Sequence, residues 1–449
     1  MTPGTTPTDP ALADAFLTDF HEVAKIGATP HNGVDRQAAT AEDRQTREWF
    51  RAFAEARGWE LRVDGIGNQL ALLELRPGSP YVLLGSHLDS QPLGGRFDGA
   101  YGVIAALHAA SRIADRLASH NDAGGADAGD DGPQFNLAVV NWFNEEGGRF
   151  APSIMGSSVF AGLMSEEEML DVRDLSGVSV REALREIGYL GTDERPEVAA
   201  YAEIHIEQGR ILERENIAIG AVDRSWYTQK LDIEVLGEQS HTGATLMSDR
   251  HDALLGAAKV IQRVHEVTDL FEPETLVSSV GQMTLEPNSP IVVARRVHLV
   301  ADLRADDREV VIKARDQILT DIREIEAEHG LVINARDFDV RDNQHYPEPG
   351  LALADQVAAD LGLGSRRIRT MAGHDSVAMN RIAPTVMLFI PSVDGVSHCE
   401  REFSRDEDMV AGVDMLTEVG WRLVHGALAD GTATSGDRVK TPVHAPAFA

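Results

Sequence analysis

The chain has 449 residues, and its 72 acidic and 41 basic residues give a formal net charge of −31, which argues against nucleic acid or an anionic membrane as a partner. The single cysteine, Cys399, excludes an internal disulfide, and no apolar run approaches the roughly 18 residues that a membrane span needs. The N-terminal segment also lacks a signal-peptide pattern, so we expect a soluble cytoplasmic protein with two or three domains.

The N-terminal half predicts an α/β sheet. Apolar residues recur at helical spacing in residues 11–57, and residues 62–75 and 81–85 are predicted to be two strands on either side of a turn. Residues 137–143 form a continuous apolar run that is typical of a central strand, and residues 198–206 predict another. Strands separated by helices indicate an α/β fold with a mixed sheet flanked by helices.

Metal-binding residue types follow these strands. His87 comes after the 81–85 strand, Glu145 and Glu146 follow the 137–143 strand, and His205 ends the next one. Asp98 lies where a glycine-containing loop enters a helix. Because ligands of α/β sheets collect at the carboxyl ends of strands, we expect these side chains to lie close together.

The next segment follows a different pattern and predicts a separate domain. Its order is β-α-β-β-α-β, which is typical of a ferredoxin-like α+β domain. We therefore expect a discontinuous catalytic metal-binding domain (1–222 and 338–430), an inserted domain (223–337) and a disordered tail (431–449). The elements are predicted at 229–236, 249–265, 276–285, 292–304, 308–329 and 331–340.

After the insertion, helical spacing at 351–361 and an apolar run at 385–390 precede a loop with His398. This histidine completes a set of imidazole and carboxylate ligands that suits zinc, manganese, cobalt or nickel. A carboxylate that bridges two ions about 3.5–4 Å apart, as in two-metal hydrolases, would leave positions open for water, and Asp98 suits this bridge. Of Glu145 and Glu146, one could act as a base and the other as a ligand. The predicted ligands are His87, Asp98, Glu146, His205 and His398.

Six blocks of sequence carry a resemblance to a known family. They look like those of the N-carbamoyl-L-amino acid hydrolase and allantoate amidohydrolase family, within a wider superfamily of dinuclear metal aminoacylases and peptidases. The resemblance runs from about Gly85 to Phe403 and covers both predicted domains. The blocks are GSHLDSQPLGGRFDGAYGV, NEEGGRF, HIEQG, GEQSHTGATLMSDRHDAL, AGHDS and GVSHCEREF.

The resemblance implies two divalent metal ions per subunit and a role for each ligand. One ion would be held by His87, Asp98 and His205, and the other by Asp98, Glu146 and His398. Glu145 would be the general base, and Asp89 would orient His87 from behind.

The resemblance also implies contacts to a small-molecule substrate. Arg304 would anchor an α-carboxylate through its guanidinium, and His241 would polarise the scissile carbonyl. Where the family usually has an asparagine, thirteen residues before Arg304, this chain has Ile291, with Asn288 three residues earlier. The implied substrate contacts are Gln208, His241, Asn288, Arg304 and His374.

The expected activity is metal-dependent hydrolysis of a linear C–N bond, most simply that of the carbamoyl group of an N-carbamoyl-L-amino acid or a related ureido acid. An allantoate amidohydrolase, an aminoacylase or a dipeptidase is the alternative within the same superfamily. A catalytically idle metal-binding scaffold is the alternative from another class, and the presence of Glu145 beside a complete ligand set argues against it. The resemblance further implies a homodimer in which the inserted domain is a dimerisation (lid) domain and supplies His241 to the neighbouring subunit.

Overall fold

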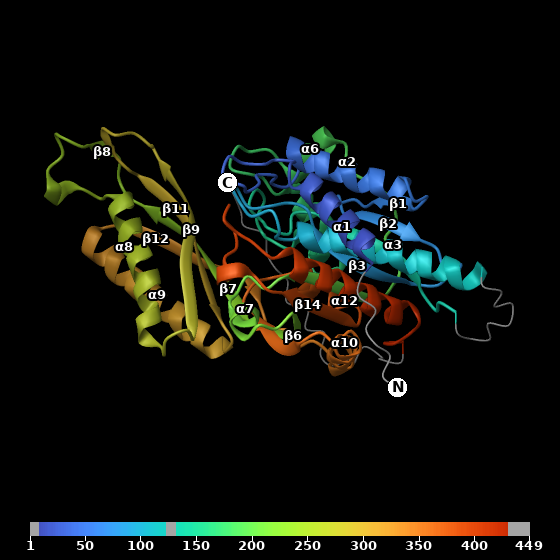
Figure 1. The fold of residues 1–449 in the computed structure, drawn as a ribbon. Helices are drawn as coiled ribbons and strands as arrows, with labels where there is room; N and C mark the ends of the chain where they lie inside the picture. Colours follow the sequence, from blue (N-terminus) through green and yellow to red (C-terminus); the bar gives the residue numbers. More distant parts are fainter. Residues whose placement is uncertain (1–8, 123–131, 430–449) are drawn as a thin grey trace. The chain divides into compact units, whose positions relative to one another are not determined.

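Contacts divide the chain into two compact units (Figure 1). The computed structural model describes residues 9–122 and 132–429. The first unit contains the described residues up to Arg224 and from His345 onward, and the second is Ser225–Gln344, which is therefore an insertion in the sequence of the first. The tail predicted at 431–449 lies outside the described residues.

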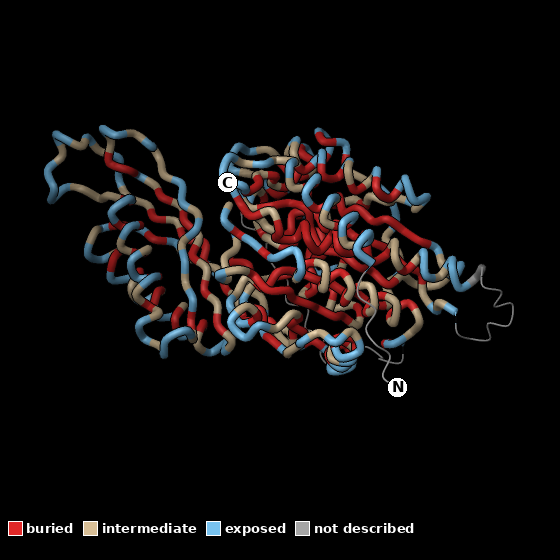
Figure 2. The backbone as a smooth tube through the Cα atoms, viewed as in Figure 1, coloured by how far each residue is buried: buried red, intermediate tan, exposed pale blue. Residues whose placement is uncertain are grey.

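The first unit contains a mixed eight-stranded sheet. In sheet order its strands are β1 (Glu60–Val63), β2 (Gln69–Leu73), β4 (Asn136–Trp142), β3 (Tyr81–His87), β5 (Val198–Ile206), β14 (Thr385–Ile390), β6 (Ile219–Ser225) and β13 (Ser365–Thr370). The central strands β4, β3, β5 and β14 run parallel, whereas β2 and β6 are antiparallel to their neighbours β4 and β14. This arrangement confirms the predicted mixed sheet, and its buried centre explains the continuous apolar runs in the sequence (Figure 2).

Helices cover both faces of this sheet. On one face, Leu84 belongs to a large core to which α1 (Pro10–Val23), α2 (Ala41–Glu55), α3 (Ala100–Asp122), α10 (Glu348–Asp360) and α12 (Asp406–Val424) contribute. On the other, Leu83 packs in a smaller cluster with Phe160 of α4 (Met155–Phe160) and Met379 of α11 (Asp375–Met379). Successive strand residues therefore enter different cores. The remaining elements are α5 (Glu166–Asp171), α6 (Val180–Ile187), α7 (Ile211–Glu215) and the 3₁₀ turn η3 (Val393–Gly395).

The segment predicted as one strand at 62–75 is instead a hairpin. Strands β1 and β2 pair antiparallel, with Val63 opposite Gln69. Between them the Asp64 carboxylate accepts the backbone N–H groups of Ile66 and Asn68, at 3.2 and 2.9 Å, and so closes a turn. The sequence does not predict this turn, because the turn depends on the single side chain of Asp64 while β-forming residues continue on both sides.

The second unit has a four-stranded antiparallel sheet with the order β12-β7-β11-β9: β12 (Val332–Arg341), β7 (Tyr227–Leu236), β11 (Arg296–Ala305) and β9 (Leu276–Glu286). Leu231 and Leu299 point to the face on which α8 (Ala253–Glu266) and α9 (Arg308–His329) pack. The order of strands and helices along the chain is β-α-β-β-α-β. A short arm pairs β8 (Ser240–His241) with β10 (Val292–Val293), and the 3₁₀ turns are η1 (Met247–Asp249) and η2 (Val267–Leu270).

The ends of α9 match its sequence signals. The Asp307 side chain caps its N-terminus by accepting the Glu309 N–H, and Gly330 ends it with a left-handed backbone, φ 60°. By contrast, β12 extends to Arg341, so the predicted border between residues 337 and 338 falls inside this strand.

Among residues 9–122 and 132–429, no helix is both long and apolar enough to cross a membrane.

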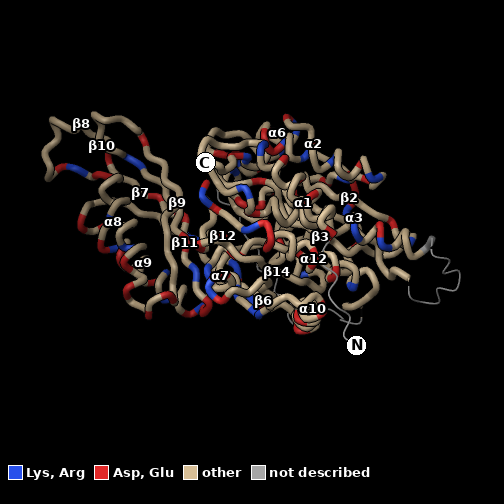
Figure 3. Tube along the Cα trace, in the orientation of Figure 1, with Lys and Arg blue, Asp and Glu red and all other residues tan. Residues whose placement is uncertain are grey.

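Charged residues, coloured in Figure 3, alternate with core residues along β7 and β11. Because successive strand residues point to opposite faces, these charges lie on the face of the second sheet opposite α8 and α9. Arg296 binds Glu234 at 2.7 Å and Glu286 at 3.0 Å across three strands. Asp232 likewise accepts from Arg336 and contacts His298. This face is therefore stabilised by cross-strand ion pairs rather than by an apolar layer.

Candidate metal centre

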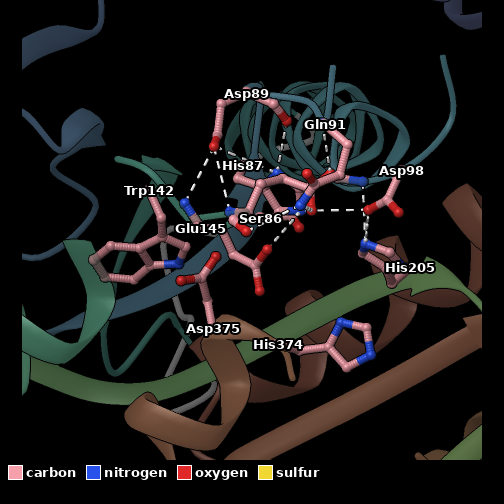
Figure 4. A network of polar contacts seen from close by, with 12 residues as sticks. Ser86, His87, Asp89, Gln91, Asp98, Trp142, Glu145, His205, His374 and Asp375 are labelled. Carbon is pink, nitrogen blue, oxygen red and sulfur yellow. Dashed lines mark hydrogen bonds and ion pairs between the residues drawn. The ribbon is translucent and has the colours of Figure 1, made fainter. Parts of the chain in front are cut away.

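The predicted ligands of the first unit converge at the carboxyl ends of its parallel strands. His87 is the last residue of β3, His205 lies near the end of β5, and Glu146 follows β4. Asp98 precedes α3, and His398 lies in the loop after β14. Figure 4 shows the side chains of His87, Asp98 and His205 directed toward one another.

Two groups of potential ligands share one carboxylate. The side chains of His87, Asp98 and His205 offer ligand atoms within 4.8 Å of one another, and so do those of Asp98, Glu146 and His398. Asp98 Oδ1 is 3.0 Å from His205 Nε2 and 3.5 Å from His87 Nε2. The other oxygen, Oδ2, is 3.4 Å from His398 Nε2, which is itself 3.3 Å from Glu146 Oε2. Asp98 therefore presents one oxygen to each group, as a bridging ligand does.

Hydrogen bonds to backbone carbonyls orient the two buried imidazoles. His87 Nδ1 lies 3.0 Å from the Asp89 carbonyl oxygen, and His205 Nδ1 lies 2.9 Å from that of Ile206. A carbonyl oxygen only accepts, so both Nδ1 atoms carry the hydrogen and both Nε2 atoms keep a lone pair. The N–H of Gly99 donates to His205 Nε2, which agrees with this tautomer.

The Glu-Glu pair stands at a backbone turn rather than in a strand. Asn144, with φ 51°, reverses the extended path directly before Glu145. The two oxygens of the Asp89 carboxylate then accept the backbone N–H groups of Glu145 and Glu146, at 3.2 and 3.3 Å. The predicted role of Asp89 is to orient His87, and both its carbonyl oxygen, at 3.0 Å, and its Oδ1, at 3.5 Å, lie near His87 Nδ1 (Figure 4). The same carboxylate holds the two glutamates.

The centre has an excess of buried negative charge. Burial raises the pKa of the Glu145 carboxyl to about 8, an effect that His87 opposes and that Glu146, Asp89 and Asp98 increase. Burial lowers the pKa of His87, but the carboxylates of Glu145, Asp89 and Asp98 outweigh this effect and raise the pKa well above its ordinary value. A potential that attracts a proton to an imidazole attracts a metal cation to the same lone pair. The donor set therefore fits a pair of divalent cations.

Two glutamates that support this centre were not predicted. Glu402, four residues after His398, accepts the N–H groups of Phe97 and Asp98 at 3.0 Å each. Glu203 lies two residues before His205 on β5, and it accepts from Ser86 at 2.9 Å. The two-residue period of a strand places Glu203 on the same side as His205, and this signal could have identified it.

Gln208 and His374 also lie in the first unit. Gln208 Nε2 donates to Asp98 Oδ2 at 2.6 Å, whereas its Oε1 is buried and has no hydrogen-bond partner among the described residues. The ring of His374 lies 4.6 Å from that of His205, centroid to centroid, and its Nε2 is 3.2 Å from Thr370 Oγ1. Burial and then His205 lower the pKa of His374 well below its ordinary value, so this imidazole stays neutral.

The other predicted substrate contacts belong to the second unit and are described within it. His241, at the end of β8, is exposed, and its Nδ1 accepts the N–H groups of Gly243 and Ala244 at 2.9 and 3.1 Å. Its Nε2 therefore carries the hydrogen and is available as a donor. Arg304 lies on the charged face of the sheet, where Asp302 accepts from its Nη2 at 2.6 Å. Asn288 and Ile291, between β9 and β10, are exposed.

Comparison with known proteins gives matches along most of the chain. The model of peptidase family M20/M25/M40 matches residues 83–421. The chain is 49% identical over 428 residues to a protein of Mycolicibacterium smegmatis named only as a hydrolase, covering 94% of this chain and 95% of that one. It is 34% identical over 410 residues to the N-carbamoyl-L-amino-acid amidohydrolase of Rhizobium meliloti, covering 90% and 94%. The crystal structure of an amidase of the hydantoinase/carbamoylase family from Burkholderia vietnamiensis superposes with a TM-score of 0.85 at 34% identity, covering 92% of this chain and 98% of that chain.

Proposed function

The chain belongs to peptidase family M20/M25/M40, and on this basis we propose that it is a metal-dependent amidohydrolase that cleaves a linear C–N bond. The preferred substrate is an N-carbamoyl-L-amino acid or a related ureido acid, which reacts with water to give the free amine, carbon dioxide and ammonia. The similarity to the Rhizobium meliloti enzyme over 90% of the chain supports this substrate class.

The observation that carries the proposal is Glu145 beside two ligand groups joined by Asp98. We assign one divalent ion to His87, Asp98 and His205 and the second to Asp98, Glu146 and His398, with zinc, manganese, cobalt or nickel as candidates. Bound there, such ions polarise a substrate carbonyl and lower the pKa of water.

Glu145 is the proposed general base. Its Oε2 is 3.5 Å from His87 Nε2, at the edge of the first ligand group, where it can reach a water bound between the two groups. It accepts a proton from the attacking water and returns it to the leaving nitrogen. The Asp89 carboxylate fixes the backbone from which Glu145 projects, so the acceptor oxygen is held in place during both transfers.

Five further residues are candidates for contacts with the substrate. His241, with its donor Nε2–H, stabilises the oxyanion, and the Arg304 guanidinium binds the α-carboxylate. The unpartnered Oε1 of Gln208 suits a substrate N–H, such as that of a carbamoyl group, and the neutral His374 contacts the same molecule. Ile291 stands where the family usually has an asparagine. Either Asn288 makes the substrate contact of that asparagine, or the end of the substrate that would carry the carboxylate is less polar. Allantoate hydrolysis, or cleavage of an acyl amino acid or dipeptide, remains the alternative activity.

We also propose that the second unit is a ferredoxin-like dimerisation (lid) domain of a homodimer. Its β-α-β-β-α-β order, its sheet order and the open edge of β9 support this assignment. In the proposed dimer, His241 of one subunit acts in the active site of the other.

Release of the free amino acid from each compound, together with ammonia from the carbamoyl and ureido substrates, tests the proposed activity. Metal-free protein reconstituted with manganese or cobalt is assayed against N-carbamoyl, N-formyl and N-acetyl amino acids, dipeptides and allantoate. We expect turnover to be fastest with an N-carbamoyl-L-amino acid or another ureido acid. Preferential cleavage of acyl amino acids or dipeptides would assign the alternative activity, and no turnover of any compound by protein with two bound ions would support an idle metal-binding scaffold.

A further inference from the structure

The Glu402 side chain connects the loop that carries Asp98 to the loop that carries His398. It is 2% exposed, and its Oε1 accepts the backbone N–H groups of Phe97 and Asp98. Its Oε2 lies 2.7 Å from Ser397 Oγ. A methyl group on Gly95 would lie 2.0 Å from Glu402 Oε1, so the Asp98 loop closes tightly around this carboxylate.

The Ser397 hydroxyl has two possible acceptors for one hydrogen. Its Oγ is 2.7 Å from Glu402 Oε2 and 2.8 Å from Asp98 Oδ2. Gln208 Nε2 donates to both Asp98 Oδ2 and Ser397 Oγ, at 2.6 and 3.2 Å. A carboxylate oxygen has two lone pairs, so Asp98 Oδ2 cannot accept from both Gln208 and Ser397 and still bind a cation.

We propose that Glu402 is a positioning residue. Its Oε2 accepts the hydrogen bond that the Ser397 hydroxyl donates, and a lone pair of Asp98 Oδ2 thereby stays free for the second metal ion. The proposal rests on the proposed dinuclear function and adds a residue to it. It concerns only the group formed by Asp98, Glu146 and His398, because the first group uses Asp98 Oδ1.

The backbone next to Ser397 makes this support more important. His398 has φ 55°, a conformation that side chains other than glycine seldom adopt and that surrounding contacts must maintain. Its side chain is also 50% exposed, in contrast to the buried His87 and His205. The second group thus combines an exposed ligand with a left-handed backbone, and Ser397 and Glu402 are among the contacts that hold this loop.

The variant Glu402→Gln reverses the direction of the hydrogen bond between residue 402 and Ser397. The N–H groups of Phe97 and Asp98 require the amide oxygen, so the amide nitrogen faces Ser397 and donates to it. Ser397 must then donate to Asp98 Oδ2 and compete with the ion. We expect the second ion to bind roughly 10–100-fold more weakly, and the first ion to bind as in the unmodified protein.

Removing the hydroxyl gives a test that a general loosening of the loop would not pass. In the double variant Ser397→Ala/Glu402→Gln no hydrogen competes for Asp98 Oδ2, so the second ion should bind more tightly than in Glu402→Gln alone. The matched control is Glu400→Gln, because Glu400 lies on the same loop and binds Thr29 rather than Asp98 or Ser397. This control should bind both ions normally.

The measurement is a titration of metal-free protein with Co²⁺ against a chromophoric chelator, with the cobalt absorption spectrum recorded at each step. His398→Ala provides the reference for loss of the second ion, and circular dichroism of the metal-free variants checks their folding. The proposal would be overturned if folded Glu402→Gln bound the second ion as tightly as the unmodified protein does. It would also be overturned if the double variant bound the second ion no more tightly than Glu402→Gln. Failure of the unmodified protein to bind two ions would instead overturn the dinuclear function on which it rests.

Discussion

The Asp89 carboxylate accepts the backbone N–H of Glu145 at 3.2 Å and so ties the end of β4 to the residue that follows β3 by two positions. We expect Asp89→Ala to lower kcat by about 10–100-fold, because it releases the general base from its anchor. Asp89→Asn keeps one acceptor and should lose less. Steady-state kinetics with matched metal content checks this order, and equal rates in the two variants would exclude an anchoring role.

Glu145→Gln is expected to keep two metal ions and to lower kcat by at least about 10²-fold, because an amide cannot take the proton of the attacking water. The measurement is turnover of the best substrate together with elemental analysis of the same sample. A variant with full activity would remove Glu145 from the proposed mechanism.

Replacement of the histidines should distinguish the two ligand groups. His87→Ala and His205→Ala each leave the first group with two protein ligands, and His398→Ala does so for the second, so each variant should retain less metal after dialysis. Elemental analysis measures the retained metal. Two full equivalents in all three variants would exclude the assignment of these residues.

A buried aspartate of the second unit should make its stability depend on acid pH. Burial raises the pKa of Asp339, but Arg341 and Lys230 outweigh this effect and lower the pKa to about 2. An aspartate in the unfolded chain has a pKa of roughly 3.9. Because the folded pKa is depressed, the stabilisation, on the order of 2 kcal/mol, is complete above about pH 4 and disappears as the pH falls through about 2.

Urea unfolding of metal-free Asp339→Asn tests this dependence. We expect the variant to be less stable than the unmodified protein at pH 6, and the difference to shrink toward pH 2. Asp337→Asn, on the same strand and 40% exposed, is the control. A difference that does not change with pH would mean that Asp339 contributes through packing alone.

Subunit mixing tests the proposed role of His241 in the neighbouring subunit. A mixture of the inactive variants Glu145→Gln and His241→Ala should recover about a quarter of the unmodified activity when subunits exchange freely, because half the dimers are mixed and each has one intact site of two. No recovery, with exchange demonstrated by differently tagged subunits, would mean that His241 serves its own chain.

The family and the ligand groups could be predicted because their signals are local. His87 is the last residue of an apolar strand, His205 is the last but one of another, and Glu146 follows a third after a short turn. The motifs around them carried a resemblance that the family match from residue 83 to residue 421 confirms. Helix α9 was likewise predictable from the N-cap residue Asp307 and from Gly330.

The supporting contacts could not be predicted, because they join residues far apart in sequence. Glu402 accepts from Asp98, 304 residues away, and nothing near either residue specifies that contact. The hairpin at Asp64 was overlooked for a different reason: its turn depends on one side chain, while the strand-forming residues continue on both sides.

The insertion of the second unit determines when the metal centre can assemble during synthesis. Strand β5 acquires its parallel neighbour β14 only after the ribosome has made all of Ser225–Gln344, and His398 emerges later still. Until then the nascent chain carries His87, Asp98 and His205 without the second group, and the β5 edge is open to pairing with other chains. Closing β14 onto β5 also joins segments that are distant in sequence, which slows folding. Early folding of the second unit would shorten this interval by bringing its two ends together, where Thr228 pairs with Arg341 and Arg224 with His345.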